Sequence, residues 1–281
     1  MVKGTTRLVG VIGDPVAHSL SPRIHNAAFR SLKLDWLYVP LRVKKENMEA
    51  ALKGLYSLGF RGANVTLPHK ETVVPFLAEL SREAAHIAAV NTIRIEPDGR
   101  MIGENTDWKG FLNHLEDVDF QAKGCKALIL GSGGSARAVG YGLARRAARI
   151  TICSRNERAA ESLAGDLGKF VPPDVPSPRA ILSLGKLDEE IELLVNTTPL
   201  GMSPDSESSP WPENIDFPEC KLVYDLVYSP QITRFMKQAR VRGVTAVNGL
   251  GMLVYQAAIA FEMWTGVSAP VEVMKQAVQT C

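Results

Sequence analysis

The sequence predicts an α/β protein with two domains, each built on a mostly parallel β-sheet. Over the first hundred residues, short apolar strand-like segments alternate with segments of helical periodicity, which is typical of βαβ units. The same alternation starts again near residue 126. A chain of 281 residues is also long for one hydrophobic core and long enough for two.

In the first domain we expect three strands, at residues 8–12, 37–43 and 60–66. The first helix should have Ser21 as its N-cap and Pro22 as its first residue, because a hydroxyl accepts a hydrogen bond from a free amide and proline has no amide to leave unpaired. The second helix should end at Gly59. Pro68 can open another helix, and the Pro-Asp-Gly turn at 97–99 predicts a hairpin.

The second domain should contain five strands, at 126–130, 149–153, 193–196, 222–226 and 244–247. Its helices are expected at 135–146 and 159–167, with two closing helices at 252–264 and 271–278. The proline-rich stretches 171–178 and 203–218 should be loops. Strands that alternate with helices again predict a parallel sheet.

Composition and charge argue against several classes of protein. With 32 basic and 30 acidic side chains the formal net charge is +2, which does not favour nucleic acid or a membrane as the partner. Cys125, Cys153, Cys220 and Cys281 lie far apart without a C-x-x-C pair, so we expect free thiols in a reducing compartment and no metal site. The apolar run at 8–12 is too short for a signal peptide or a membrane span, so we expect a cytoplasmic protein.

A glycine-rich turn follows the strand at 126–130 and precedes a helix. It consists of Gly131, Ser132, Gly133, Gly134, Ser135 and Ala136. This fits the G-x-G-x-x-G/A pattern in its strand–turn–helix setting: Gly131 allows the tight turn, Gly133 lets the backbone approach a pyrophosphate, and Ala136 keeps the helix close to the sheet. The sequence therefore predicts a Rossmann-like dinucleotide-binding domain.

The next strand indicates which dinucleotide binds. NAD enzymes usually place an acidic residue at the end of this strand, about 20 positions after the glycines, to bind the ribose 2′-hydroxyl. Here the strand ends in Ser154-Arg155-Asn156, with Arg158 nearby and no carboxylate before Glu157. A guanidinium pairs well with a phosphate, so we expect NADP as the cofactor.

Polar side chains also gather at several points of the first domain where a strand or helix has no structural need of them. They occur at 19–22, 64–70, 89–92 and 105–107. Because α/β sheets bind ligands at the carboxyl ends of their strands, we expect a hydroxylated, anionic small molecule in the cleft between the domains. The chain should thus be a dehydrogenase that transfers a hydride between NADP(H) and this substrate.

At the level of motifs, the chain resembles shikimate dehydrogenase over essentially its whole length. The matching motifs are His18–Pro22 (H-S-L-S-P), Asn64–Lys70 (N-V-T-x-P-x-K), Ala89–Thr92 (A-V-N-T), Asn105–Asp107 (N-T-D), the glycine turn, Asn196–Met202 (N-T-T-P-L-G-M) and Gly249–Ala257 (G-L-G-M-L-V-x-Q-A). The resemblance implies reversible NADPH-dependent reduction of 3-dehydroshikimate to shikimate in aromatic amino-acid (chorismate) biosynthesis. It also implies an interrupted first domain, to which the C-terminal helices return: 1–106 with 250–281 would bind substrate, and 107–249 would bind NADP.

The resemblance also implies roles for single residues. Lys70 and Asp107 would be the catalytic pair and would contact the substrate. The other substrate-binding residues would be Ser19, Ser21, Asn64, Thr66, Asn91, Tyr228 and Gln256. The nicotinamide half of the cofactor would be bordered by Thr197, Leu226, Gly249 and Met252. Ser154, Arg155 and Arg158 would surround the 2′-phosphate, although the family's usual Asn-Arg-Thr motif is altered here.

Reduction of a ketone needs a proton delivered to its oxygen. Lysine side chains are protonated at neutral pH, so Lys70 would be the proton donor, with Asp107 keeping it charged and oriented. His18, His25 and His69 lie near the motifs, and we expect them to be structural or adjacent to the substrate. The alternatives are a quinate/shikimate dehydrogenase that uses NAD, a non-catalytic metabolite sensor, and a related fold acting on folate or amino-acid substrates. Either a monomer or a homodimer is compatible with the sequence.

Overall fold

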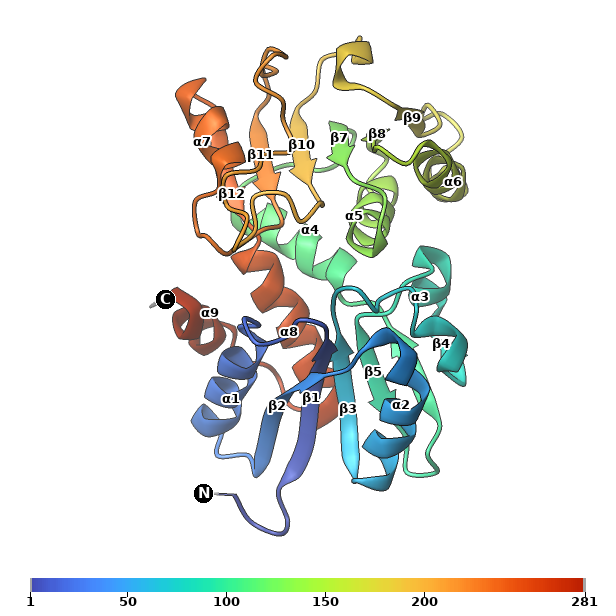
Figure 1. Ribbon diagram of the computed structural model, residues 1–281, viewed down its shortest axis with the longest axis vertical. Coiled ribbons are helices and arrows are strands. Elements are labelled where there is room, and N and C mark those ends of the chain that lie inside the picture. Colours follow the sequence, from blue (N-terminus) through green and yellow to red (C-terminus); the bar gives the residue numbers. More distant parts are fainter. Residues whose placement is uncertain (1, 280–281) are drawn as a thin grey trace. The chain divides into compact units, whose positions relative to one another are not determined.

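The computed structural model describes residues 2–279 and contains two compact units (Figure 1). Unit 2 is Phe111–Met252, and unit 1 consists of the described residues on either side of it. The chain passes from one unit to the other within α4 (Asp107–Asp117) and again within α8 (Leu250–Thr265). Cys281, one of the four expected thiols, lies outside the described residues.

Unit 1 contains a mixed six-stranded sheet of order β2-β1-β3-β5-β6-β4. Its strands are β1 (Arg7–Gly13), β2 (Trp36–Arg42), β3 (Phe60–Val65), β4 (Glu79–Leu80), β5 (Thr92–Ile95) and β6 (Met101–Glu104). β1 pairs in parallel with β2 and β3, whereas β5 runs antiparallel to both β3 and β6. The expected hairpin is therefore present, and it places the ends of β3 and β6 and the start of β5 at one edge of the sheet.

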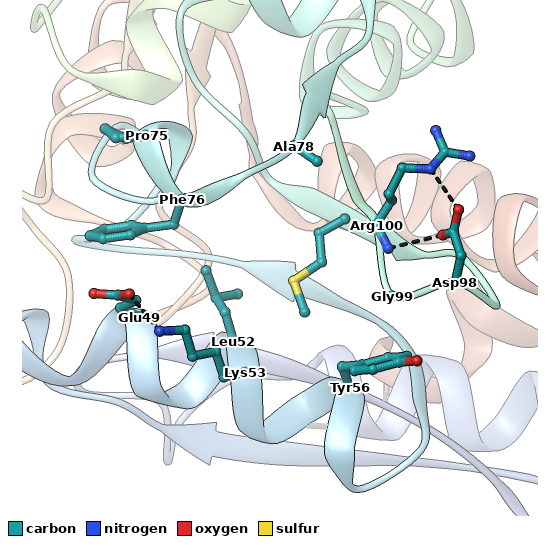
Figure 2. A pocket seen from close by; sticks show the side chains of 11 residues that line it. Glu49, Leu52, Lys53, Tyr56, Pro75, Phe76, Ala78, Asp98, Gly99 and Arg100 are labelled. Atoms are coloured by element: carbon teal, nitrogen blue, oxygen red, sulfur yellow. Dashed lines mark hydrogen bonds and ion pairs between the residues drawn. The ribbon is translucent and has the colours of Figure 1, made fainter.

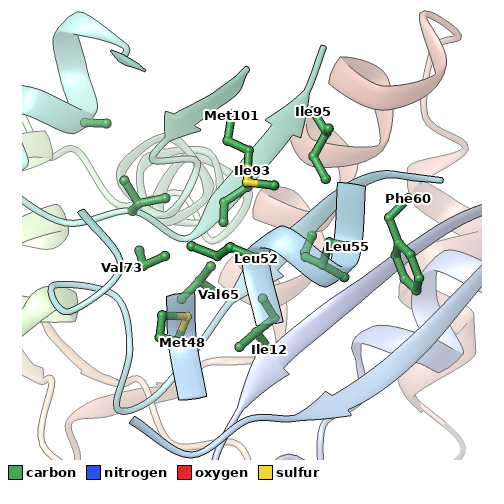
Figure 3. Close-up of a cluster of buried hydrophobic side chains, with 13 residues drawn as sticks. Ile12, Met48, Leu52, Leu55, Phe60, Val65, Val73, Ile93, Ile95 and Met101 are labelled. Atoms are coloured by element: carbon green, nitrogen blue, oxygen red, sulfur yellow. The ribbon is translucent and has the colours of Figure 1, made fainter. Parts of the chain in front are cut away.

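Unit 1 also contains helices. They are α1 (Ser21–Ser31), α2 (Met48–Ser57), α3 (Arg82–Ile87), α9 (Val271–Gln279) and most of α8, together with two short 3₁₀ turns, η1 (Lys45–Asn47) and η2 (Val74–Phe76). α1 lies beside α9 (Figure 1), so the C-terminal segment packs on the N-terminal one. α2 packs against the sheet through Met48, Leu52 and Leu55, which join Ile12, Val65 and Ile93 in a buried cluster (Figure 3).

The start of α1 differs from the prediction. Leu20, not Ser21, is the N-cap residue, because the Leu20 carbonyl already accepts hydrogen bonds from the amides of Arg23 and Ile24. Ser21 is the first residue of the helix, and its own amide donates to the Ser19 hydroxyl oxygen at 3.3 Å.

The helix expected at Pro68 is also absent from the described chain. The segment after β3 instead forms turns that lead to η2. The Lys70 carbonyl accepts a hydrogen bond from the Val90 amide, and this tertiary bond takes the place of an intrahelical one. The turn is thereby anchored to the segment that enters β5.

Unit 2 contains a fully parallel sheet of order β12-β11-β10-β7-β8-β9. Its strands are β7 (Lys126–Leu130), β8 (Arg149–Cys153), β9 (Arg179–Ile181), β10 (Leu193–Asn196), β11 (Leu222–Asp225) and β12 (Thr245–Asn248). α5 (Gly134–Ala144) and α6 (Glu157–Gly168) pack on β7, β8 and β9, and α7 (Arg234–Val241) packs on β11 and β12. The strand order reverses between β7 and β10, which is the ligand-binding switch point of Rossmann sheets.

The predicted α/β fold class is confirmed. Sequence periodicity did not indicate β4, β9, α3, α4 or α7. Among the helices of residues 2–279, none has the length and apolar character that a membrane crossing requires.

Candidate active site

Lys70 and Asp107 form an ion pair in unit 1. The Lys70 ammonium Nζ lies 2.7 Å from Asp107 Oδ2, and their side chains are only 14 % and 7 % exposed. Lys70 lies in the turn after β3, and Asp107 is the first residue of α4, where the positive end of the helix dipole stabilises a carboxylate. The structure therefore holds an ammonium group in a fixed direction at a largely buried position.

Asn91 connects this pair to its surroundings. Its amide nitrogen Nδ2 donates to Asp107 Oδ1 at 2.9 Å and to Gln256 Oε1 of α8 at 3.2 Å. Its amide oxygen accepts the backbone N–H of Thr106 at 2.7 Å. Four of the predicted substrate-site residues, two of them 165 positions apart, are thus joined by hydrogen bonds.

Three other predicted residues lie at neighbouring strand ends and helix starts. Ser19 and Ser21 flank the N-cap of α1, with Ser21 buried and Ser19 half-buried. Thr66 follows β3, and its amide donates to the Ile12 carbonyl of β1. A Cβ added to Gly13 would come within 2.6 Å of Thr66 Cγ2, so the glycine makes room for this threonine.

Asn64 is buried at the end of β3, and both of its amide protons are used within the protein. Nδ2 donates to the Asn91 carbonyl at 3.1 Å and to Thr92 Oγ1 at 2.9 Å. Oδ1 accepts the Tyr38 hydroxyl at 2.7 Å. The resemblance assigns Asn64 to substrate binding. Because both amide protons are already used, Asn64 could bind a ligand only by accepting a further hydrogen bond at Oδ1.

The histidines near the motifs differ in environment. His18 is exposed, whereas His25 and His69 are fully buried. The His25 ring stacks on Tyr38 at 4.3 Å, and burial lowers the pKa of His25 to about 3. His69 Nε2 lies 2.7 Å from the Val43 carbonyl oxygen. His25 is therefore neutral at physiological pH and packs as an aromatic ring.

In unit 2, the glycine turn follows β7 as predicted. Gly131 has a φ of +110°, and a Cβ on it would come within 2.6 Å of Thr197 Oγ1. Gly133 is the N-cap of α5 without a side-chain cap, and the N-terminus of a helix favours an anion. Ala136 is fully buried, so the helix lies close to the sheet. These features fit a pyrophosphate cradle.

The end of β8 lies beside this turn. Ser132 Oγ and Ser154 Oγ are 2.9 Å apart, and the Gly131 amide donates to the Cys153 carbonyl. Arg155 and Arg158 are exposed, and neither makes an ion pair within the described chain. Two available guanidinium groups next to the cradle fit a 2′-phosphate.

The predicted nicotinamide neighbours follow consecutive strands of unit 2. The Thr197 amide and hydroxyl both donate to the Leu130 carbonyl, at 2.9 and 2.7 Å. Gly249 lies so near Leu226 that an added Cβ would be 2.1 Å from the Leu226 carbonyl oxygen. Met252 is buried. Tyr228 follows β11, and burial raises the pKa of its hydroxyl.

Asp225 is an important buried residue that the sequence analysis did not single out. Its carboxylate accepts hydrogen bonds from Asn196 Nδ2, the Val227 amide and the Thr233 hydroxyl, at 2.8, 3.1 and 2.6 Å. Burial raises the pKa of Asp225 to about 6. Through its hydrogen bonds to Asn196 and Thr233, Asp225 connects the end of β10 to the start of α7. A carboxylate directly after the apolar run of β11 was the signal available in the sequence.

A pocket of unit 1 lies away from these residues. It has a volume of about 570 Å³ and opens between α2, η2 and the β5–β6 hairpin (Figure 2). Its lining includes Leu52, Tyr56, Phe76 and Arg100, and it contains none of the predicted site residues. Within residues 2–279 no group of histidine, cysteine and carboxylate side chains has the arrangement of a metal site.

Comparison with known proteins identifies the family. Residues 11–93 match the shikimate dehydrogenase substrate binding domain, and residues 249–279 match the shikimate 5′-dehydrogenase C-terminal domain. The shikimate dehydrogenase (NADP(+)) of Desulforamulus reducens is 45 % identical over 98 % of this chain and 95 % of its own length. This chain belongs to the shikimate dehydrogenase family.

Further comparisons support this membership over the full length. The shikimate dehydrogenase (NADP(+)) of Carboxydothermus hydrogenoformans is 45 % identical over 99 % of this chain and 98 % of its own. The crystal structure of shikimate 5-dehydrogenase from Thermus thermophilus, in complex with NADP(H) and shikimate, superposes with a TM-score of 0.87 at 38 % identity, covering 98 % of this chain and 99 % of that one. The resemblance to shikimate dehydrogenases noted in the sequence is thus confirmed.

Proposed function

We propose that this member of the shikimate dehydrogenase family catalyses the reversible, NADPH-dependent reduction of 3-dehydroshikimate to shikimate, a step of aromatic amino-acid biosynthesis. The observation that carries the proposal is the 2.7 Å ion pair of Lys70 and Asp107, which is held by Asn91 within a buried polar cluster. The full-length relatives named as NADP(+)-dependent shikimate dehydrogenases support it.

In the reduction, Lys70 donates a proton to the carbonyl oxygen of 3-dehydroshikimate, and in the reverse direction it takes that proton back from the shikimate hydroxyl. Asp107 accepts a hydrogen bond from the Lys70 ammonium and so directs it. NADPH, which the glycine turn, Arg155 and Arg158 of unit 2 would hold, would supply the hydride for the reduction, and NADP⁺ would accept it in the reverse direction. Because the pair is largely buried, water competes little for the ammonium.

The substrate's other groups would be held by residues near this pair. Ser19 and Ser21 would donate hydrogen bonds to the carboxylate, with Tyr228 close to it. Thr66, Asn91 and Gln256 would bind the ring hydroxyls; Asn91 and Gln256 are already linked to each other at 3.2 Å. A set of neutral hydrogen-bonding groups suits a hydroxylated ring, because each group left unpaired by a wrong substrate weakens its binding.

NADP would bind to unit 2. The amides at the start of α5, between Gly131 and Ala136, would receive the pyrophosphate. Arg155 and Arg158 would pair with the 2′-phosphate, and Ser154 would lie beside it. Thr197, Leu226, Gly249 and Met252 would border the nicotinamide ring. We accordingly propose residues 1–106 with 250–281 as the substrate-binding domain and 107–249 as the NADP-binding domain.

One chain contains every residue that this proposal uses, so a monomer suffices for catalysis and a homodimer would carry two independent sites. The thiols of Cys125, Cys153 and Cys220 are free, which fits a reducing compartment, and we place the reaction in the cytoplasm.

The test is steady-state oxidation of shikimate, followed by the absorbance of the reduced nicotinamide. We expect turnover with NADP⁺, with a kcat/KM about 10- to 100-fold above that with NAD⁺, because a charge-assisted pair to the 2′-phosphate contributes about 1.5–3 kcal/mol. Quinate serves as the matched substrate. A higher kcat/KM with quinate and NAD⁺ would replace the proposal by a quinate dehydrogenase, and binding without turnover would make the protein a sensor.

A further inference from the structure

A chain of buried hydrogen bonds leads from Tyr38 on β2 to the catalytic pair. The Tyr38 hydroxyl donates to Asn64 Oδ1 at 2.7 Å, Asn64 Nδ2 donates to Thr92 Oγ1 at 2.9 Å, and Thr92 Oγ1 donates to Asn91 Oδ1 at 3.1 Å. Asn91 then donates to Asp107, which holds Lys70. None of the roles proposed above involves Tyr38 or Thr92. Both residues are buried, with 1 % and 0 % of their surface exposed.

Two backbone groups determine the direction of this chain. The Asn91 carbonyl can only accept, so the Asn64 atom that faces it at 3.1 Å must be the amide nitrogen. Asn64 Oδ1 then faces Tyr38, whose hydroxyl must donate. The Thr106 N–H can only donate, so the Asn91 atom that faces it at 2.7 Å must be the amide oxygen. Nδ2 of Asn91 therefore points toward Asp107.

Thr92 is the link between these two amides. Its hydroxyl oxygen accepts a hydrogen bond from Asn64 Nδ2, and its hydroxyl donates a hydrogen bond to Asn91 Oδ1. If the Asn91 amide were rotated by half a turn, its oxygen would face the Asp107 carboxylate, and two acceptors would be opposed in a buried place. The hydrogen bond from the Thr92 hydroxyl to Asn91 Oδ1 disfavours this rotation, and so does the hydrogen bond from the Thr106 amide to the same oxygen.

We propose that Tyr38, Asn64 and Thr92 are positioning residues, which orient the Asn91 amide and through it the Asp107 carboxylate that directs Lys70. This inference rests on the proposed function for the reaction it serves. It gives Asn64 a role inside the protein, in accordance with the use of both its amide protons there.

The experiment compares Thr92→Val, which removes the hydroxyl, with Thr92→Ser, which keeps it, by the kcat and KM of shikimate oxidation with NADP⁺. We expect Thr92→Val to lower kcat about tenfold, the loss that corresponds to one neutral hydrogen bond, with the KM for NADP⁺ unchanged. Thr92→Ser should remain within about twofold of the unsubstituted protein. A role in folding alone would lower the melting temperature and leave kcat as it was.

Thr151→Val is the matched control. Thr151 is also a buried strand threonine, on β8, whose hydroxyl is hydrogen-bonded to Glu189 and Arg179. Its substitution should change the melting temperature but not kcat. An unchanged kcat in folded Thr92→Val, or an equal loss in the valine and serine variants, would overturn the proposal.

If Thr92→Val does not fold, Tyr38→Phe serves as a second variant to test the proposal. It preserves the ring that stacks on His25 and removes the first donor of the chain. We expect kcat to fall about threefold, and an unchanged kcat would overturn the proposal in the same way.

A readout without substrate separates this inference from the proposed function. If the unsubstituted protein does not oxidise shikimate, the proposed function fails, but the rate at which Lys70 is acetylated by acetic anhydride still reports how firmly Asp107 holds it. Thr92→Val should speed acetylation of Lys70 about threefold relative to Thr92→Ser, with the exposed Lys53 as internal reference. Equal rates would refute the positioning role.

Discussion

His25 offers a quantitative test of the buried environment of unit 1. Its ring is 0 % exposed, stacks on Tyr38 with an interplanar angle of 3° and lies 5.5 Å from the Trp264 ring. Within the described chain no well-formed hydrogen bond reaches either ring nitrogen. Burial disfavours the charged imidazolium more than the nearby Asn64 side chain favours it, so the pKa of His25 falls from 6.5 to about 3.

The sign of the effect on stability follows from proton uptake. Between pH 6.5 and pH 3 the unfolded chain binds a proton at His25 that the folded chain does not bind, so the free energy of unfolding falls as the pH falls through this window. Each pH unit is equivalent to about 1.4 kcal/mol. At pH 5, which is one and a half units below the ordinary pKa of 6.5, the burial of His25 should lower the free energy of unfolding by about 2 kcal/mol.

His25→Phe removes the titrating group and keeps an aromatic ring in the stack. Urea unfolding at pH 7 and at pH 5, followed by tryptophan fluorescence and circular dichroism, should show that the variant loses about 2 kcal/mol less than the unsubstituted protein between the two pH values. Asp225, whose raised pKa of about 6 acts in the opposite direction, is present in both proteins and cancels from the comparison.

His18→Phe is the control, because His18 is exposed. It should leave the dependence of stability on pH unchanged. If His25→Phe and the unsubstituted protein lost the same stability between pH 7 and pH 5, or if NMR showed the His25 ring protonated at pH 5, the burial argument would be wrong.

Four further substitutions test the catalytic, cofactor and packing arguments. Lys70→Ala should lower kcat by about 10²- to 10⁴-fold with little change in the KM for shikimate, because a lost acid–base group acts on the transition state. Arg155→Gln should raise the KM for NADP⁺ about tenfold or more and leave the kinetics with NAD⁺ as they are. Gly251→Ala should reduce the free energy of unfolding by about 1–3 kcal/mol, since the new Cβ would lie 2.1 Å from the ring of His114, which is fixed by a 2.5 Å hydrogen bond to a buried tyrosine. Gly54→Ala, in a helix with open space around it, should instead stabilise by about 0.5–1 kcal/mol.

Each of these expectations has a contrary outcome. Near-normal turnover of Lys70→Ala would remove Lys70 from the chemistry. Equal losses with NADP⁺ and NAD⁺ in Arg155→Gln would show that the guanidinium does not contact the 2′-phosphate. Similar melting temperatures for Gly251→Ala and Gly54→Ala would mean that the contact with His114 relaxes without cost.

Prediction from the sequence was most successful where local pattern decides the structure. The strands β7 and β8 and the turn at Gly131 were expected almost residue by residue, because a short apolar run that ends at glycine or polar residues has few alternatives. Pro68 and Ser21 show the limit. Both are good helix-start residues, yet the bond between the Lys70 carbonyl and the Val90 amide, and the position of Leu20, decided the outcome. Such tertiary bonds have no local signature.

The candidate site divides in the same way. Motifs identified Lys70, Asp107 and Asn91 as candidates, but α4, which carries Asp107 at its start, was not expected. The roles of Tyr38 and Thr92 were missed because a tyrosine or threonine in a strand is ordinary for that structure. Only their hydrogen bonds to Asn64 distinguish them.

The sequence by itself determined the class of fold, the place of the glycine turn and the family, because each depends on the order of residues along short segments. Tertiary structure alone decided which polar groups meet: Lys70 and Asp107 are 37 positions apart, and Asn91 and Gln256 are 165 apart. It also decided that His25 and Asp225 are buried, and hence the opposite directions of their pKa shifts. The physical reason is that hydrogen-bond direction and desolvation depend on the atoms around a group, and folding brings those atoms from distant parts of the chain.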